Sequence, residues 1–165
     1  MPELPEVEVT RRGIAPTLTG HRVFAAIART PALRYPLPEN LEQKLGGQRL
    51  AAVSRRGKYL LLDFGHGHLL IHLGMSGSLR LVPASLPAEK HDHFDLVFGI
   101  QRRKVALRLR DPRRFGAILW LQDDPLQHPL LATLGVEPLT EEFNAAWLRK
   151  ELAGLSAAIK PTLMD

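Results

Sequence analysis

Cysteine is absent from the 165-residue sequence. Its absence excludes disulfide bonds and thiolate zinc sites, and it gives no sign of an oxidising compartment. Long apolar runs are absent too, since none approaches the roughly 20 residues of a membrane-spanning helix. The first twenty residues contain three glutamates and no apolar central region, unlike a signal peptide. We therefore expect a soluble cytoplasmic protein without a membrane segment.

Positive charge is plentiful and unevenly distributed. The chain has 22 basic and 17 acidic residues, a net charge of +5 and a pI of about 10.0. Such a balance favours a polyanionic partner. Seven of the basic residues crowd into one short segment with a single acid, Asp111; they stand at positions 102, 103, 104, 108, 110, 113 and 114. This segment predicts a phosphate-binding surface.

Short apolar segments separated by turn residues fill the middle of the chain. Gly65-His66-Gly67, for example, separates two apolar runs as a tight hairpin does. The expected strands are 21–29, 48–55, 58–64, 68–73, 78–82, 94–99, 104–110 and 116–121. We predict a mainly β protein with helices (α+β class), in which a β-sandwich is flanked by an N-terminal helix.

The N-terminal residues have helical periodicity. Apolar residues recur at helical spacing at Leu4, Val7, Ile14 and Leu18. This pattern predicts a helix over residues 3–12 or slightly beyond, which ends near Gly13 or Pro16. A second, short helix is expected over 41–45.

After Asp123 the strand pattern gives way to a helical one. We expect a helical turn at 129–134 and another helix beginning within 156–165. Between them Thr140 is the predicted cap of a helix over 141–152, with Phe143, Trp147 and Leu148 on its buried side. The predicted domains are residues 1–128, a catalytic β-sandwich, and residues 129–165, the beginning of an all-α domain.

The first residues carry groups suited to covalent catalysis. Removal of Met1 would leave Pro2 with a free secondary amine, and an α-amino group has a pKa of about 7.7 to 8.0. Such an amine attacks electrophilic carbon to form an iminium (Schiff base), and Glu3 beside it is a candidate acid or base. The same residues also fit a purely structural helix start, with a proline in the first turn and Glu8 paired with Arg12.

Four further residues stand at turns or strand ends where side chains project. Lys58 follows a basic stretch and stands at the head of a strand. It is either a phosphate contact or a solvated charge at a turn. Met75 is flanked by glycines, so it is a candidate apolar wedge for the space left by an extruded base. Arg113 and Phe115 are a candidate pair for contacting an orphaned base, although Phe115 also fits a core position.

His91 and His93 are two residues apart and share a strand face. That spacing is compatible with a metal site, but no third ligand lies nearby in the sequence. We therefore predict no metal site.

The sequence resembles formamidopyrimidine-DNA glycosylase, a family of bacterial base-excision repair enzymes. The resemblance rests on PELPEVE at 2–8 with RRG at 11–13, GKYLL at 57–61, HLGMSG at 72–77 and DPRRFG at 111–116, together with HDHFD at 91–95. A sister family, endonuclease VIII, usually opens PEGPE, so Leu4 favours the first family. The family's helix-two-turns-helix domain and its four-cysteine zinc finger are incomplete or missing here.

The resemblance implies a bifunctional glycosylase and abasic-site lyase acting on oxidised purines such as 8-oxoguanine and formamidopyrimidines. It assigns catalysis to Pro2, Glu3 and Lys58, DNA contacts to His91, Arg113 and Lys160, and void filling on base flipping to Met75, Arg113 and Phe115. The implied partner is double-stranded DNA containing oxidised purines or abasic sites, bound by a monomer in the bacterial cytoplasm. The chain itself is expected to need no cofactor, the family's structural zinc belonging to the missing finger.

Two other functions fit the same residues. The chain is alternatively a non-catalytic DNA-binding fragment that engages phosphates through residues 102–114. The second alternative is an endonuclease VIII-like glycosylase for oxidised pyrimidines.

Overall fold

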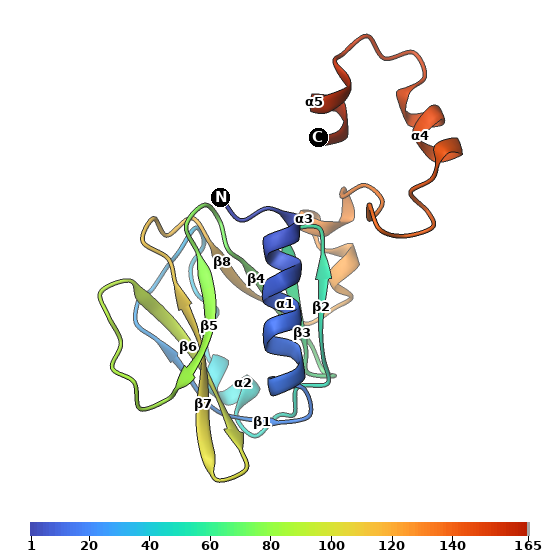
Figure 1. Cartoon of the computed structure of the whole chain (residues 1–165). Coiled ribbons are helices and arrows are strands. Elements are labelled where there is room, and N and C mark those ends of the chain that lie inside the picture. Colours follow the sequence, from blue (N-terminus) through green and yellow to red (C-terminus); the bar gives the residue numbers. More distant parts are fainter. Residues whose placement is uncertain (165) are drawn as a thin grey trace. The chain divides into compact units, whose positions relative to one another are not determined.

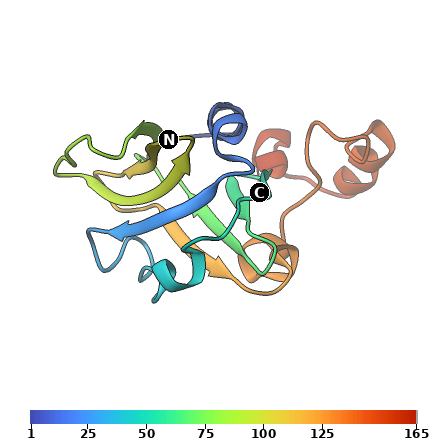
Figure 2. The same ribbon diagram turned by 90° about the horizontal axis from the view of Figure 1, so that it is seen from below.

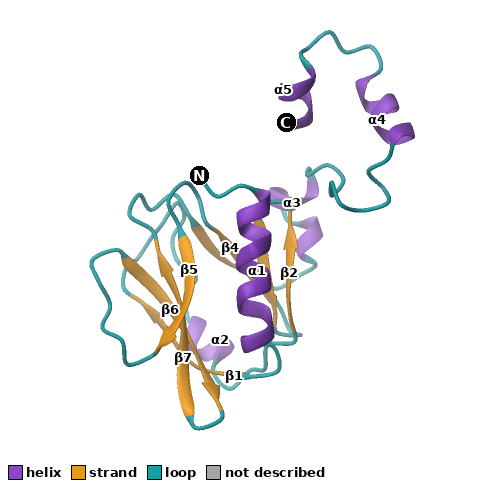
Figure 3. Cartoon of the chain, viewed as in Figure 1, coloured by secondary structure: helices purple, strands orange, loops and turns teal. Residues whose placement is uncertain are grey.

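The computed structural model describes residues 1–164 and divides the chain into two compact units, Met1–Ala132 and a second unit that begins at Thr133. The first unit contains every strand of the described chain (Figure 3). No helix in residues 1–164 is long and apolar enough to cross a membrane.

Two four-stranded antiparallel sheets form the first unit (Figure 1). One sheet has the order β1 (Arg22–Ala28), β6 (Asp92–Ile100), β7 (Arg103–Arg110) and β5 (Ser78–Pro83). The other has the order β2 (Ala52–Arg56), β3 (Tyr59–Asp63), β4 (His68–His72) and β8 (Ala117–Leu121). The view from below shows the curvature of the strands (Figure 2). The predicted α+β sandwich is therefore confirmed, and each predicted strand is present with ends that shift by a few residues.

The core lies between the sheets because their apolar side chains alternate inward. Leu60, Leu62 and Ile71 come from one sheet, and Phe94 and Leu96 come from the other; all are at most 1% exposed. Burial of each such side chain contributes about 1.5–3 kcal/mol. The core thus holds rigidly the strand ends from which the loops of the site project.

The first helix, α1 (Leu4–Leu18), is longer than predicted. It continues through Gly13 and Pro16, so the predicted end near these residues is wrong. Ile14 and Leu18 are buried in the core, and their burial offsets the hydrogen bond that Pro16 cannot donate. At its start, Glu3 donates its backbone N–H to a carboxylate oxygen of Glu6 at 3.0 Å. The helix therefore begins at a defined point directly after Pro2.

The remaining helices are short. The predicted helix at 41–45 is confirmed as α2 (Leu41–Leu45). A 3₁₀ turn, η1 (Pro125–Gln127), and α3 (Pro129–Ala132) close the first unit, so the predicted turn over 129–134 ends two residues early.

The second unit holds α4 (Ala145–Leu152) and α5 (Ile159–Met164), and none of its described residues is fully buried. The prediction that Thr140 caps a helix from 141 is wrong. The cap is Asn144, whose side-chain oxygen accepts from the Trp147 N–H at 2.9 Å. The predicted buried side is only partly formed: Phe143, Trp147 and Leu148 are half-buried, and the rings of Phe143 and Trp147 lie 5.5 Å apart. A segment this short cannot bury a core of its own.

Candidate active site

The start of α1 and the β2–β3 turn bring two predicted catalytic residues into contact. Lys58 Nζ lies 2.6 Å from a carboxylate oxygen of Glu3, with the Lys58 and Glu3 side chains 36% and 42% exposed. Gly57 precedes Lys58 with a φ of +56°, which turns the chain so that the lysine heads β3. Pro2, half-buried, is the next residue before Glu3. An amine position, a carboxylate and an ammonium therefore gather at one point of the surface.

A second ion-pair group ties α1 to the sheet beneath it. Glu8 binds Arg12 at 2.8 Å, as predicted, and it also binds Arg11 at 2.7 Å and Arg55 of β2 at 3.0 Å. Hydrogen bonds from Arg11, followed by those from Arg12 and Arg55, hold the pKa of the Glu8 carboxyl well below its usual range despite the opposing effect of burial. This group stabilises the orientation of the helix that carries Glu3.

Replacement of Glu8 by Gln is expected to lower the free energy of unfolding by about 1–3 kcal/mol at neutral pH, because the hydrogen bonds from three arginines lose their charged acceptor. The depressed pKa contributes stability above the ordinary value of 4.5 and loses it as pH falls below that value. The difference between the two proteins should therefore shrink in acid. Urea unfolding between neutral and acidic pH measures it. Glu39→Gln, at an exposed position, is the control, and a difference independent of pH would contradict the assignment.

The loop between β4 and β5 touches the loop between β7 and β8 through a glycine. Gly74 has a φ of +61°, and a Cβ there would lie 2.4 Å from the backbone carbonyl carbon of Phe115. Only glycine permits this approach without a backbone shift. The next residue, Met75, is 42% exposed and projects from the loop tip, as predicted for a wedge.

Gly74→Ala is expected to lower the free energy of unfolding by about 2–4 kcal/mol, since it adds a backbone clash to a left-handed conformation. Gly13→Ala is the matched control, because a Cβ at Gly13 meets nothing within 4 Å on helix α1. It is expected to stabilise the protein by up to about 1 kcal/mol. Equal effects of the two substitutions in denaturant unfolding would refute this account of Gly74.

Asp111 joins the same two loops and was missed in the sequence. It is fully buried and accepts hydrogen bonds from Ser76 Oγ at 2.7 Å and the Gly116 N–H at 2.8 Å. Ser76 Oγ in turn accepts from the Arg113 N–H at 3.1 Å. A single acid within a basic segment, directly before a proline, was the signal available. Asp111 thus sets the relative position of Met75 and the Arg113–Phe115 turn.

Arg113 and Phe115 lie together at the surface, as predicted for a contacting pair. The Arg113 guanidinium carbon is 4.7 Å from the centre of the Phe115 ring. Phe115 is 45% exposed, so the alternative placement in the core is wrong. Between them Arg114 has a φ of +56°, and this turn keeps both neighbours on the outside.

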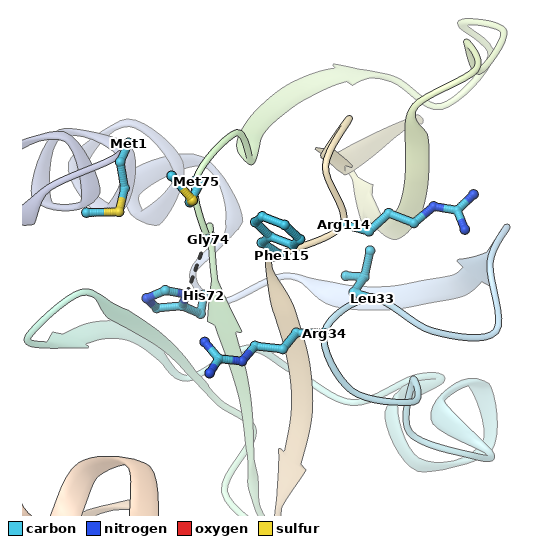
Figure 4. Close-up of a pocket in the computed structure, with 8 residues that line it drawn as sticks. All are labelled: Met1, Leu33, Arg34, His72, Gly74, Met75, Arg114 and Phe115. Carbon is cyan, nitrogen blue, oxygen red and sulfur yellow. Dashed lines mark hydrogen bonds between the residues drawn. The ribbon is translucent and has the colours of Figure 1, made fainter.

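A pocket of about 560 Å³ opens beside these loops (Figure 4). Phe115 and Met75 lie along its rim near Met1, and Arg34 and His72 line it below. Sequence reasoning did not identify Leu33, Arg34 or His72 as site residues. His72 was visible only as the first letter of the HLGMSG block.

The contacts of His72 favour one tautomer of its ring. Its Nδ1 accepts the Gly74 N–H at 3.1 Å, and its ring lies 4.7 Å from that of Tyr59. Burial lowers its pKa, and the charges of Arg34 and Lys58 lower it further. A neutral His72 with Nδ1 as acceptor carries its proton on Nε2, which makes it a hydrogen-bond donor at the pocket.

His91 and His93 differ in environment. His93 is buried, and its ring Nε2 lies 3.1 Å from the Asp111 carbonyl oxygen; burial lowers its pKa first and the charge of Arg114 second. His91 is less buried, with its ring 6.3 Å from that of His93. Residues 1–164 contain no cluster of three side chains suited to a metal ion. His93 therefore supports the Asp111 loop.

The basic segment 102–114 does not form one surface, so the predicted phosphate-binding surface does not include all seven basic residues. Arg108 is 1% exposed and binds Asp95 and the carbonyl oxygens of Leu86 and Pro87. Arg110 pairs with Glu89 at 2.5 Å. Strand β7 carries Arg102–Lys104 to the opposite end from Arg113, roughly 25 Å away at about 3.3 Å per residue.

Lys160, the remaining predicted site residue, is exposed on α5 in the second unit. It therefore belongs to a different unit from the residues described above.

Comparisons with known proteins give a consistent match. The model of the formamidopyrimidine-DNA glycosylase N-terminal domain matches residues 1–118. The formamidopyrimidine-DNA glycosylases of Aromatoleum aromaticum and Methylococcus capsulatus are 59% and 53% identical over the whole chain. The chain spans 59% and 60% of their respective lengths.

Solved structures agree with the sequence match. The Lactococcus lactis enzyme bound non-covalently to DNA with an abasic site has a TM-score of 0.86 at 33% identity, over 99% of this chain and 62% of that one. The same enzyme in complex with DNA containing FAPY-dG gives a TM-score of 0.85 at 33% identity, over 98% of this chain and 60% of that one.

Proposed function

Since the chain belongs to the formamidopyrimidine-DNA glycosylase family, we propose that it acts in base-excision repair as a bifunctional glycosylase and abasic-site lyase for oxidised purines. The observation that carries the proposal is the contact of Glu3 with Lys58 directly beside Pro2. A structural helix start alone does not require a lysine from a distant turn at this carboxylate.

The proposed reaction begins once Met1 has been removed. The Pro2 amine attacks the anomeric carbon of the damaged nucleotide, and the bond to the base breaks. Glu3 protonates the sugar ring oxygen and promotes ring opening to the iminium. The iminium acidifies the neighbouring sugar carbon, whose proton is lost as the 3′ phosphate leaves. Lys58 binds phosphate and assists this elimination.

Base extrusion leaves a gap in the duplex. We assign the filling of this gap to the exposed side chains of the two loops. Met75 would enter the gap, and Phe115 would stack beside it. Arg113, already in contact with Phe115, would hydrogen-bond to the orphaned base. His91 and Lys160 would bind DNA phosphates.

The chain spans about 60% of its relatives, so the activity and the DNA partner of the whole enzyme are proposals here. We assign catalysis to the sandwich. The helical DNA-binding domain was predicted from 129 onward, and we assign its start to the second unit, which begins at Thr133. The reaction requires no cofactor. The zinc finger of the family has no counterpart in this cysteine-free sequence.

Borohydride trapping tests the proposal. The protein is incubated with duplex DNA containing an abasic site and reduced, and the adduct is measured by intact mass and located by proteolysis. We expect a covalent adduct on Pro2 of the trimmed protein. Pro2→Leu, which favours retention of Met1, is the control and should give no adduct at residue 2.

A non-catalytic DNA-binding role is the second candidate, because the exposed Arg113–Phe115 pair can contact DNA without amine chemistry at Pro2. A trimmed protein that binds abasic duplex but gives no adduct would favour that role. The rates of base release from a duplex with an oxidised purine and from one with an oxidised pyrimidine distinguish the proposed lesion preference from that of endonuclease VIII. Faster release of the pyrimidine would overturn the proposed substrate class.

A further inference from the structure

The tip of the β6–β7 hairpin is a second basic surface, separate from the candidate active site. Arg102, Arg103 and Lys104 are all exposed there. Figure 1 shows this hairpin tip at the end of the sandwich opposite the N-terminus. Its charges therefore lie outside the group formed by Pro2, Glu3 and Lys58.

Exposed apolar side chains lie on edge strand β1, with Phe24 beside this tip and Ile27 further along the strand, opposite Asp95. Phe24 is 58% exposed and Ile27 is 42% exposed. The register of β1 shifts between Val23 and Ala25, so Phe24 occupies an irregularity in the strand. Lys104 Nζ lies 3.6 Å from the centre of the Phe24 ring, which joins the apolar side chain directly to the basic tip.

The sheet register places Phe24, Ile27 and Lys104 on the outer face of the sheet. Arg103 pairs with Ile100, which packs against the core, so Arg103 projects from the other face at the exposed hairpin tip. Gly99 pairs with both Arg22 and Lys104, and it presents no side chain between Phe24 and the lysine. Ala26 packs against the core, so the alternation of the strand directs Ile27 outward. Phe24 and Ile27 are therefore exposed apolar side chains on the face that also carries Arg22 and Lys104.

The cations of this surface have no acidic partner among the residues that the structure describes. Arg22 donates to the Gly47 carbonyl oxygen and Arg49 to that of Gly20. Throughout residues 1–164, no carboxylate oxygen lies within 4.0 Å of the cationic nitrogens of this group. We call the whole set the distal basic surface: Arg22, Arg49, Arg102, Arg103 and Lys104, with Phe24 and Ile27.

We propose that the distal basic surface binds an acidic polypeptide segment with apolar side chains, supplied by a partner protein. Carboxylates of the segment pair with the five cations, and its apolar side chains cover Phe24 and Ile27. Nucleic acid fits less well, because Ile27 offers nothing to a phosphate and Lys104 occupies one face of the Phe24 ring. Such a contact leaves the candidate active site free for DNA.

Fluorescence anisotropy tests the proposal with two labelled probes, a short polyaspartate peptide containing two phenylalanines and a DNA duplex containing a tetrahydrofuran analogue of an abasic site. The double variant Arg103→Glu/Lys104→Glu is expected to weaken peptide binding at least about tenfold, and Phe24→Ser about fivefold, with duplex affinity changed less than about twofold. Arg113→Ala is the matched control at the other end. It should weaken duplex binding and leave peptide binding unchanged. Circular dichroism melting verifies that each variant is folded.

Three outcomes would overturn the proposal. If the double variant and the unaltered protein bind the peptide with the same affinity, the peptide does not bind at this surface. A large loss of duplex affinity with no loss of peptide affinity would make the tip a DNA contact. Equal binding of a polyaspartate peptide without phenylalanine would show charge attraction alone. None of these results bears on the trapping of Pro2, so the two proposals fail independently.

Discussion

Glu3→Gln is expected to slow the release of an oxidised purine by roughly 10²–10⁴-fold, the usual contribution of general acid catalysis. An amide cannot deliver a proton to the sugar ring oxygen, and it also removes the charged partner that lies 2.6 Å from Lys58. Single-turnover release of 8-oxoguanine from duplex DNA measures the effect. The duplex must be saturated with protein so that the rate reports chemistry and not binding.

Two comparisons separate catalysis from structure in this experiment. Cleavage of a preformed abasic site should fall much less than base release, because that substrate has already lost its base. Glu6→Gln is the matched control, since Glu6 lies in the same helical turn and accepts a hydrogen bond from the Glu3 N–H. It should change the release rate by less than about tenfold. Equal losses for Glu3→Gln and Glu6→Gln would reassign Glu3 to the helix start.

Asp111→Ala should produce the largest loss of stability, about 3–5 kcal/mol in the free energy of unfolding. The substitution leaves Ser76 Oγ and the buried Gly116 N–H without their acceptor and opens a cavity where the carboxylate stood. The melting temperature should fall by roughly 10–20 °C. Thermal unfolding followed by circular dichroism measures this change.

Asp111→Asn distinguishes the hydrogen bonds from the volume of the side chain. Asparagine has the same shape and keeps one acceptor oxygen, so most of the stability should remain. A loss as large as that of the alanine variant would show that the charge itself is required. Unchanged stability in both variants would contradict the position of Asp111 at the junction of the two loops.

The sequence by itself determined the fold class and most elements of this protein. Alternating apolar residues separated by glycines and prolines predicted the strands, because the period of two and the turn chemistry are local properties. The helix ends were less predictable. Gly13 and Pro16 weaken a helix locally, and only the burial of Ile14 and Leu18 against the sheets decided that α1 continues.

The sequence also identified candidate site residues through their motifs, but it could not place them relative to one another. Glu3 and Lys58 are far apart in the chain and meet because Glu8 and Arg55 hold α1 against β2. The sequence predicts one basic surface over residues 102–114, yet strand β7 separates its ends and Arg108 is paired inside the protein. Asp111, Arg34 and His72 acquired roles only through contacts between loops. Such contacts depend on sheet pairing over long sequence separations, and no local pattern records them.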